Sequence, residues 1–83
     1  MVKVNAKRTG DKIKRQMAIA DIDSNALAKK LGYADRSTVN RWIRGESVPS
    51  YENLVNMAIA FKCRVKDLVT FEEENGSKEW QDS

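Results

Sequence analysis

The chain has 83 residues, with 15 Lys and Arg, 12 Asp and Glu, no histidine and one cysteine. A chain of this size forms one domain with a thin core, and its composition excludes a zinc site built from the usual ligands. The charge is uneven: residues 1–68 hold 14 basic and 7 acidic side chains (net +7), whereas residues 69–83 hold 1 and 5 (net −4). A basic body with an acidic end predicts a polyanionic partner.

Apolar segments are short throughout the chain. The longest run, residues 57–61, is far below the ~20 residues that cross a bilayer, and the N-terminus lacks the apolar stretch of a signal peptide. A lone cysteine, Cys63, cannot form an internal disulfide, which fits a reducing compartment. We therefore expect a cytoplasmic protein that uses no metal and no cofactor and does not associate with membranes.

Glycine and proline are scarce, and they divide the chain into segments with helical periodicity. Thr9 is a suitable N-cap for a first helix over residues 10–20. Asp23 caps a second, short helix over residues 24–31, and Gly32 suits the left-handed residue that ends such a helix.

A third helix is expected to follow Asp35, as its N-cap, and to stop at Gly45. Ser50 caps a fourth helix, and a last short helix is predicted over residues 64–71. No segment shows the strict alternation of a half-buried strand over more than three or four residues. The sequence therefore predicts an all-α, five-helix fold without a sheet. The predicted organisation is a basic flexible arm (1–8), a helical domain (9–71) and an acidic disordered tail (72–83).

The segment from Asp23 to Gly45 is the most informative part of the sequence. Ala28 is small enough to let two short helices cross closely, Gly32 permits the turn between them, and Val39 fills the angle. This pattern is typical of a helix-turn-helix, in which the second helix lies in the DNA major groove. The outward positions of that second helix all carry side chains that can form hydrogen bonds, and none of these side chains is acidic. They are Arg36, Ser37, Thr38, Asn40, Arg41 and Arg44.

From about residue 10 to residue 69 the chain resembles the lambda-repressor and Cro-like (XRE-type) helix-turn-helix family. The matching stretches, in order, are residues 27–32 (LAKKLG), residues 36–45 (RSTVNRWIRG) and the Pro-Ser pair at 49–50 with Leu54. The resemblance implies a dimeric, sequence-specific transcriptional repressor or activator that binds a palindromic operator in double-stranded DNA. We expect a repressor of the phage or mobile-element type that acts by occupying its operator.

The resemblance also assigns roles to individual residues. The positions that read bases in this family fall here on Arg36, Ser37, Asn40 and Arg41. The chemistry agrees, because arginine offers a bidentate fork to guanine and asparagine does the same for adenine. The positions that contact the DNA backbone fall on Ser24, Thr38, Arg44 and Ser47.

Several alternatives remain open from the sequence. Apolar residues near the C-terminus suggest a dimer contact, or else a segment that closes a small core: Val65, Leu68, Val69 and Phe71. The same fold could serve as an antitoxin or anti-repressor whose main ligand is a protein. An enzyme is disfavoured, because the chain offers few groups for general acid–base catalysis. Trp42 is interpreted as a core residue, and Cys63 as a small hydrophobic side chain.

Overall fold

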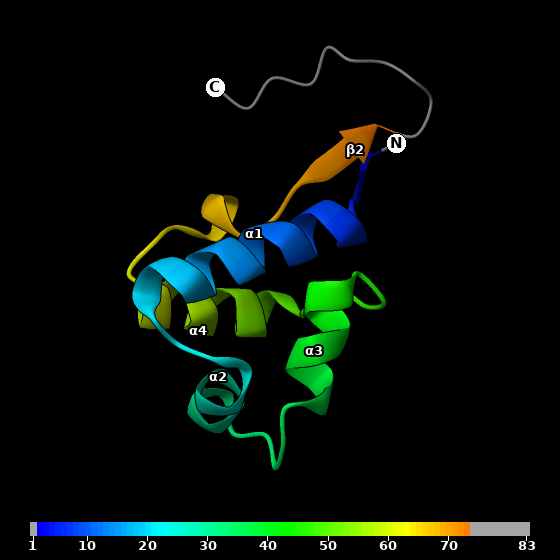
Figure 1. Ribbon diagram of the computed structural model, residues 1–83. Coiled ribbons are helices and arrows are strands. Elements are labelled where there is room, and N and C mark those ends of the chain that lie inside the picture. The colour runs from blue at the N-terminus through cyan, green and yellow to red at the C-terminus, as the bar shows by residue number, and fades with distance from the viewer. Residues whose placement is uncertain (1, 74–83) are drawn as a thin grey trace.

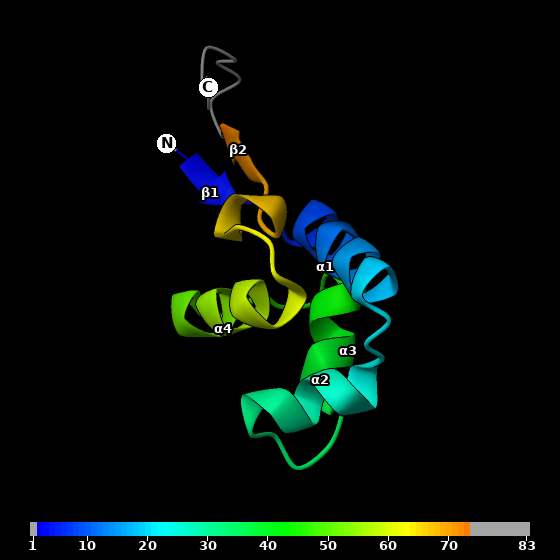
Figure 2. The same cartoon turned by 90° about the vertical axis from the view of Figure 1, so that its left-hand side faces the viewer.

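The computed structural model describes residues 2–73 of the 83-residue chain. Within that range, the chain forms four α-helices, with one short strand at each end (Figures 1 and 2). The elements in chain order are β1 (Val2–Val4), α1 (Ala6–Ala20), α2 (Ser24–Leu31), α3 (Ser37–Arg44), α4 (Tyr51–Phe61), a single 3-10 turn η1 (Val65–Asp67) and β2 (Phe71–Glu73). The mostly helical fold is confirmed, whereas the prediction of a fifth α-helix is wrong.

The first helix starts four residues earlier than predicted. Its N-cap is Asn5, whose side-chain oxygen accepts a hydrogen bond from the Arg8 backbone N–H at 2.9 Å. Thr9, the predicted cap, lies inside the helix and is almost fully buried, and its hydroxyl oxygen accepts a hydrogen bond from the Thr70 N–H at 3.1 Å. Both Asn and Thr are suitable N-cap residues. The hydrogen-bond partner of the Thr9 hydroxyl lies 61 positions away, so local sequence patterns cannot reveal it.

The other helix boundaries follow their predicted signals closely. The Asp23 carboxylate accepts from the Ala26 N–H at 2.8 Å, and the Ser50 hydroxyl accepts from the Asn53 N–H at 3.2 Å. Gly32 ends α2 with φ +88° and Gly45 ends α3 with φ +79°, in the left-handed region where glycine avoids strain.

The predicted absence of a sheet is also wrong. β1 and β2 pair in antiparallel fashion, with Val2 opposite Glu73 and Val4 opposite Phe71. Residues 2–8, predicted as a flexible arm, thus form β1, the Asn5 cap and the first turn of α1. Of the predicted acidic tail, residues 72 and 73 belong to β2, and residues 74–83 lie outside the described residues. Strands of three residues, separated by most of the chain, leave no periodic signal in the sequence.

The segment predicted as a last helix, 64–71, instead runs as the turn η1 and then extends toward β2. The backbone N–H of Arg64 donates to the Asp67 carboxylate at 2.9 Å, which closes the turn. The Lys12 ammonium donates to the carbonyls of Lys66 and Val69 at 3.3 and 3.2 Å. These two carbonyls therefore have a hydrogen-bond donor on α1, whereas in a helix they would face amides of the same helix. These contacts tie the C-terminal segment to α1.

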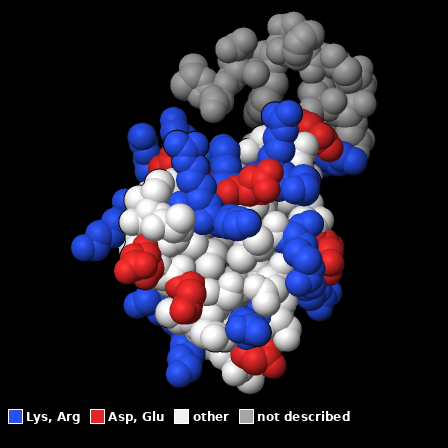
Figure 3. All heavy atoms as spheres, in the orientation of Figure 1, with Lys and Arg blue, Asp and Glu red and all other residues white. Residues whose placement is uncertain are grey.

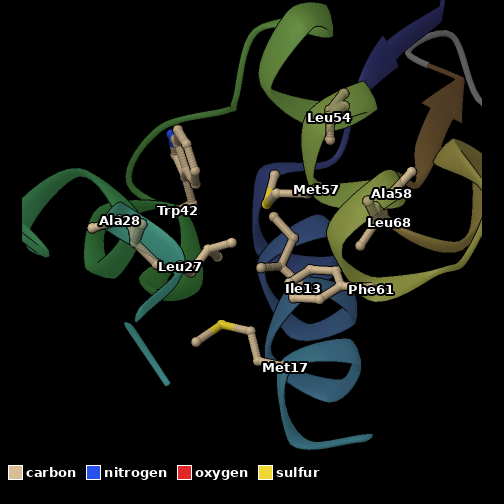
Figure 4. Packing of buried hydrophobic residues seen from close by; sticks show 11 residues of the cluster. Ile13, Met17, Leu27, Ala28, Trp42, Leu54, Met57, Ala58, Phe61 and Leu68 are labelled. Carbon is tan, nitrogen blue, oxygen red and sulfur yellow. The ribbon is translucent and has the colours of Figure 1, made fainter. Parts of the chain in front are cut away.

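One hydrophobic core joins all four helices (Figure 4). Ile13 from α1, Leu27 from α2, Val39 from α3 and Met57 from α4 have no exposed surface, and Trp42 is 3% exposed. Trp42 is therefore a core residue, as predicted. The remaining buried members of the cluster are Met17, Ala28, Leu54, Ala58, Phe61 and Leu68.

Gly10 sets the distance between α1 and the end of α3. A β-carbon built at this position would meet the backbone carbonyl oxygen of Trp42 and lie 2.7 Å from that of Ile43. Any side chain would force these two helices apart, so glycine is required here for close approach rather than for a special backbone angle.

Candidate nucleic-acid interface

The turn between α2 and α3 is fixed by hydrogen bonds and packing. The N–H of Tyr33 donates to the Ala28 carbonyl at 2.9 Å, which continues the cap that Gly32 begins. The ring of Tyr33 stands edge-on to Trp42 at a centroid distance of 6.0 Å, and its hydroxyl accepts a hydrogen bond from the Asn53 side chain at 2.8 Å. These contacts link the turn to α3 and α4, so α3 is held in one orientation.

The N-cap of α3 is Arg36 rather than Asp35, so the predicted cap is wrong by one residue. The start of the helix is nevertheless held by Asp35. Its carboxylate accepts a hydrogen bond from the Ser37 N–H at 2.9 Å, the first amide of the helix. Hydrogen bonds from the Ser37 backbone and side chain hold the pKa of this exposed carboxyl below its ordinary value. The negative charge of Asp35 also stabilises α3, because the helix dipole is positive at the N-terminus.

The side of α3 that faces away from the core carries the predicted base-reading residues. Arg36, Ser37 and Arg41 are exposed, and Asn40 is half-buried. Val39 and Trp42 point the other way, into the core, so the two sides of this eight-residue helix are separated clearly. No residue of α3 is acidic, which leaves its outer side free to approach phosphate groups.

Asn40 and Ser24 contact each other across the helix-turn-helix. The Ser24 hydroxyl lies 3.0 Å from Oδ1 of Asn40 and donates a hydrogen bond to it. This bond joins the first turn of α2 to the middle of α3, and it leaves the amide N–H groups of Asn40 as donors for another partner. The two residues line a shallow hollow between the helix starts, together with Asp23, Asn25 and Arg36.

Arg44, predicted to contact the DNA backbone, is paired with an acidic residue that sequence reasoning passed over. Its guanidinium donates two hydrogen bonds to Glu46, at 2.7 and 3.3 Å. Hydrogen bonding to Glu46 raises the pKa of Arg44, and hydrogen bonding to Arg44 lowers the pKa of Glu46. The spacing of two residues across the Gly45 turn was the available signal. Glu46 therefore competes with phosphate for Arg44.

The remaining backbone-contact candidates flank this region. Thr38 in the first turn of α3 and Ser47 in the loop before α4 are both half-buried. Basic side chains continue beyond the helix-turn-helix: Figure 3 shows Lys and Arg over much of the visible face, with Asp and Glu among them. The visible face thus carries many basic side chains, interrupted by acidic and uncharged ones.

The four apolar residues near the C-terminus lie apart from this surface. Leu68 has no exposed surface and Val69 is 8% exposed, so both are buried within their own chain. Val65 is half-buried against the same core, and Phe71 in β2 is 47% exposed. Of the four, Phe71 alone is largely accessible to another molecule.

Other kinds of site find little support in the described part of the chain. Residues 2–73 contain no group of three or more metal-ligating side chains. In the same range, no helix combines the length and apolar character that a membrane span requires. Cys63 is half-buried, and burial raises the pKa of its thiol, which disfavours the reactive thiolate.

Fold and site together define a small helical domain with an exposed polar helix in a helix-turn-helix. Comparison with family models gives the same result: the helix-turn-helix model matches residues 12–68. The chain belongs to this family, the Cro/C1-type (XRE) helix-turn-helix, whose members are DNA-binding transcription regulators. No curated protein and no solved structure gives a significant match.

Proposed function

We propose that this chain is a sequence-specific repressor that binds a palindromic operator as a homodimer and represses by occupying it. The observation that supports this proposal is the N-cap and outer side of α3, where Arg36, Ser37 and Arg41 are exposed, Asn40 is half-buried and no residue of the helix is acidic. Arginine and asparagine are the residues best suited to bidentate recognition of guanine and adenine in the major groove.

In the bound state, the four outer residues of α3 read base edges. Asn40 accepts from Ser24 through one lone pair of Oδ1, which leaves a second lone pair and both N–H donors for an adenine. Because Ser24 restrains the rotation of this amide, the adenine-reading geometry exists before DNA arrives. Less ordering entropy is then lost on binding.

The backbone contacts set the position of the dimer on DNA. Thr38 and Ser47 donate hydrogen bonds to phosphate oxygens, and Arg44 exchanges its carboxylate partner, Glu46, for a phosphate. Ser24 donates through its backbone N–H at the start of α2, because its hydroxyl proton is held by Asn40. Because Arg and Lys displace counterions from DNA, binding weakens steeply as salt rises. Repression then requires no chemical step, since the bound dimer excludes other proteins from the site.

The test is a selection from a pool of random DNA duplexes at two salt concentrations, followed by sequencing of the bound fraction. The proposal predicts one enriched palindromic motif, with half-site centres about one helical turn (34–36 Å) apart. Binding without an enriched motif, lost at the higher salt, would show a basic surface without sequence recognition.

The double variant Arg36→Ala with Arg41→Ala separates this function from a protein-binding role on the same fold. A DNA reader loses the motif in the selection when these two side chains are removed. An antitoxin or anti-repressor that acts through a protein partner keeps its activity.

A further inference from the structure

α4 is apolar on two sides, but the described residues, 2–73, cover only one of them. Only Glu52 and two asparagines among its 11 residues are polar. Leu54, Met57 and Phe61 are buried in the core, as the spacing of three and four residues requires. A helix that is apolar all round is normally buried all round.

The uncovered side consists of Tyr51, Val55 and Ile59, at intervals of four residues. Tyr51 is 74% exposed and Ile59 is 69% exposed, and Val55 between them is half-buried. We call these three residues the α4 stripe. In Figure 2, α4 extends from the middle of the helical body to its outer edge, and no other described helix or strand lies beyond its outer end. Large side chains at helical spacing on such an edge mark an interaction surface.

We propose that the α4 stripe is the surface through which two copies of this chain associate, with the two α4 helices antiparallel. An antiparallel pair is two-fold symmetric, so each stripe meets an identical stripe. With Val55 of one copy opposite Ile59 of the other, this apolar contact forms at two symmetry-related places. At Val55 and Ile59 the stripe is therefore complementary to a second copy of itself in hydrophobicity.

Charges at the two ends of α4 favour the same arrangement. Glu52 is exposed in the first turn, and Lys62 is exposed at the C-cap. Antiparallel pairing with Val55 opposite Ile59 also sets Glu52 of each copy opposite Lys62 of the other. A parallel pair would place like charges together, which disfavours it.

Only the role of this dimer rests on the proposed function, because a two-fold dimer matches a palindromic operator. One side of an 11-residue helix, about 16 Å long, gives an interface below the standard size of a stable complex. The free protein is therefore a weak dimer, with a dissociation constant of about 10–300 µM, and operator DNA stabilises it.

Sedimentation equilibrium without DNA tests the proposal independently of operator binding. The structure offers a matched pair of substitutions, Ile59→Lys on the stripe and Ile19→Lys on α1. The two isoleucines are equally exposed, at 69% and 68%, and both lie near the C-terminus of a helix. We expect the dissociation constant to rise at least about tenfold for Ile59→Lys and to change less than about twofold for Ile19→Lys.

A charge swap tests the orientation of the pair without removing apolar surface. Lys62→Glu should weaken the dimer about two- to fivefold, and adding Glu52→Lys to the same chain should restore it. A wild-type chain that stays monomeric to about 500 µM would overturn the proposal. So would equal effects of the two isoleucine substitutions, or a double charge variant that is weaker than Lys62→Glu alone. A random-duplex selection that fails while the dimer behaves as described would reject the proposed function and leave this inference intact.

Discussion

Replacing Gly10 with alanine should destabilise the protein, although the same change in most helices is stabilising. In an open helix, Gly→Ala improves stability by up to about 1 kcal/mol. Here the added methyl group meets two backbone carbonyls at the end of α3, those of Trp42 and Ile43, the second at 2.7 Å. A backbone oxygen cannot rotate away as a side chain can, so α1 and α3 must separate.

The magnitude follows from these two opposing effects. Overpacking a close contact costs about 1–3 kcal/mol, and the upper half of that range applies because two rigid groups are involved. After the gain in helix propensity, we expect a net loss of about 1–2 kcal/mol in the free energy of unfolding. For a domain of this size the melting temperature should fall by about 4–16 °C.

The assay is thermal and urea denaturation followed by circular dichroism at 222 nm. Gly32→Ala is the control, because a β-carbon there meets nothing within 4 Å and only the left-handed φ of +88° opposes it. That variant should lose about 1 kcal/mol through backbone conformation alone. If Gly10→Ala is as stable as the parent or more stable, the close approach of α1 and α3 is refuted.

Three further predictions concern the interface and its support. Ser24→Ala removes the hydrogen bond to Asn40; it should keep the fold and weaken operator binding about three- to tenfold in a fluorescence titration. Glu46→Gln removes the competitor of Arg44; it should tighten DNA binding about two- to fivefold and steepen the salt dependence. The Asp35 carboxyl has a lowered pKa in the folded state, so its contribution to stability is complete above the pKa of the unfolded chain and is lost as pH falls through the folded value. Acid titration of stability should show that loss in the parent and not in Asp35→Asn.

Each of these predictions has a result that contradicts it. Equal weakening of operator and unrelated DNA by Ser24→Ala would show that the bond does not support base reading. Unchanged affinity in Glu46→Gln would mean that Arg44 does not reach a phosphate. An identical acid profile for the parent and Asp35→Asn would show that the Asp35 carboxylate does not stabilise the start of α3.

The parts of the fold that sequence reasoning found depend on neighbouring residues. Asp23 and Ser50 bond to amides three positions away, and Gly32 and Gly45 set the backbone at their own positions. Such signals are complete within a few residues of sequence. The helix-turn-helix was predictable for the same reason, because the side chain of Ala28 and the turn at Gly32 act over short distances.

The parts that were missed depend on residues far apart in the chain. Thr9 is a residue type that often caps helices, but here its hydroxyl accepts a hydrogen bond from the Thr70 N–H. The strand β1 forms only because β2 pairs with it. The segment at residues 64–71 has helical spacing, yet Lys12 binds two of its carbonyls and the chain continues into a strand instead. Tertiary contacts override local propensity in each case.

The candidate interface shows the same division. The outward positions of α3 followed from the helical repeat, so Arg36 and Arg41 were correctly expected to be exposed. The contacts among site residues required the structure, because the bond from Ser24 to Asn40 joins two helices and the pair of Arg44 and Glu46 forms across a turn. The burial of Leu68, predicted as part of a dimer contact, likewise depends on how the whole chain packs.

We propose that the outer side of α3 reads DNA sequence rather than only attracting DNA by charge. The most direct measurement compares Arg41→Ala with Lys14→Ala, an exposed basic residue on α1, on the selected operator and on an unrelated duplex. Both variants lose one positive charge and should lose similar affinity for unrelated DNA. We expect Arg41→Ala alone to lower the ratio of the affinity for the operator to the affinity for unrelated DNA, by about 5- to 150-fold. Equal loss of that ratio in both variants, or no loss in either, would contradict it.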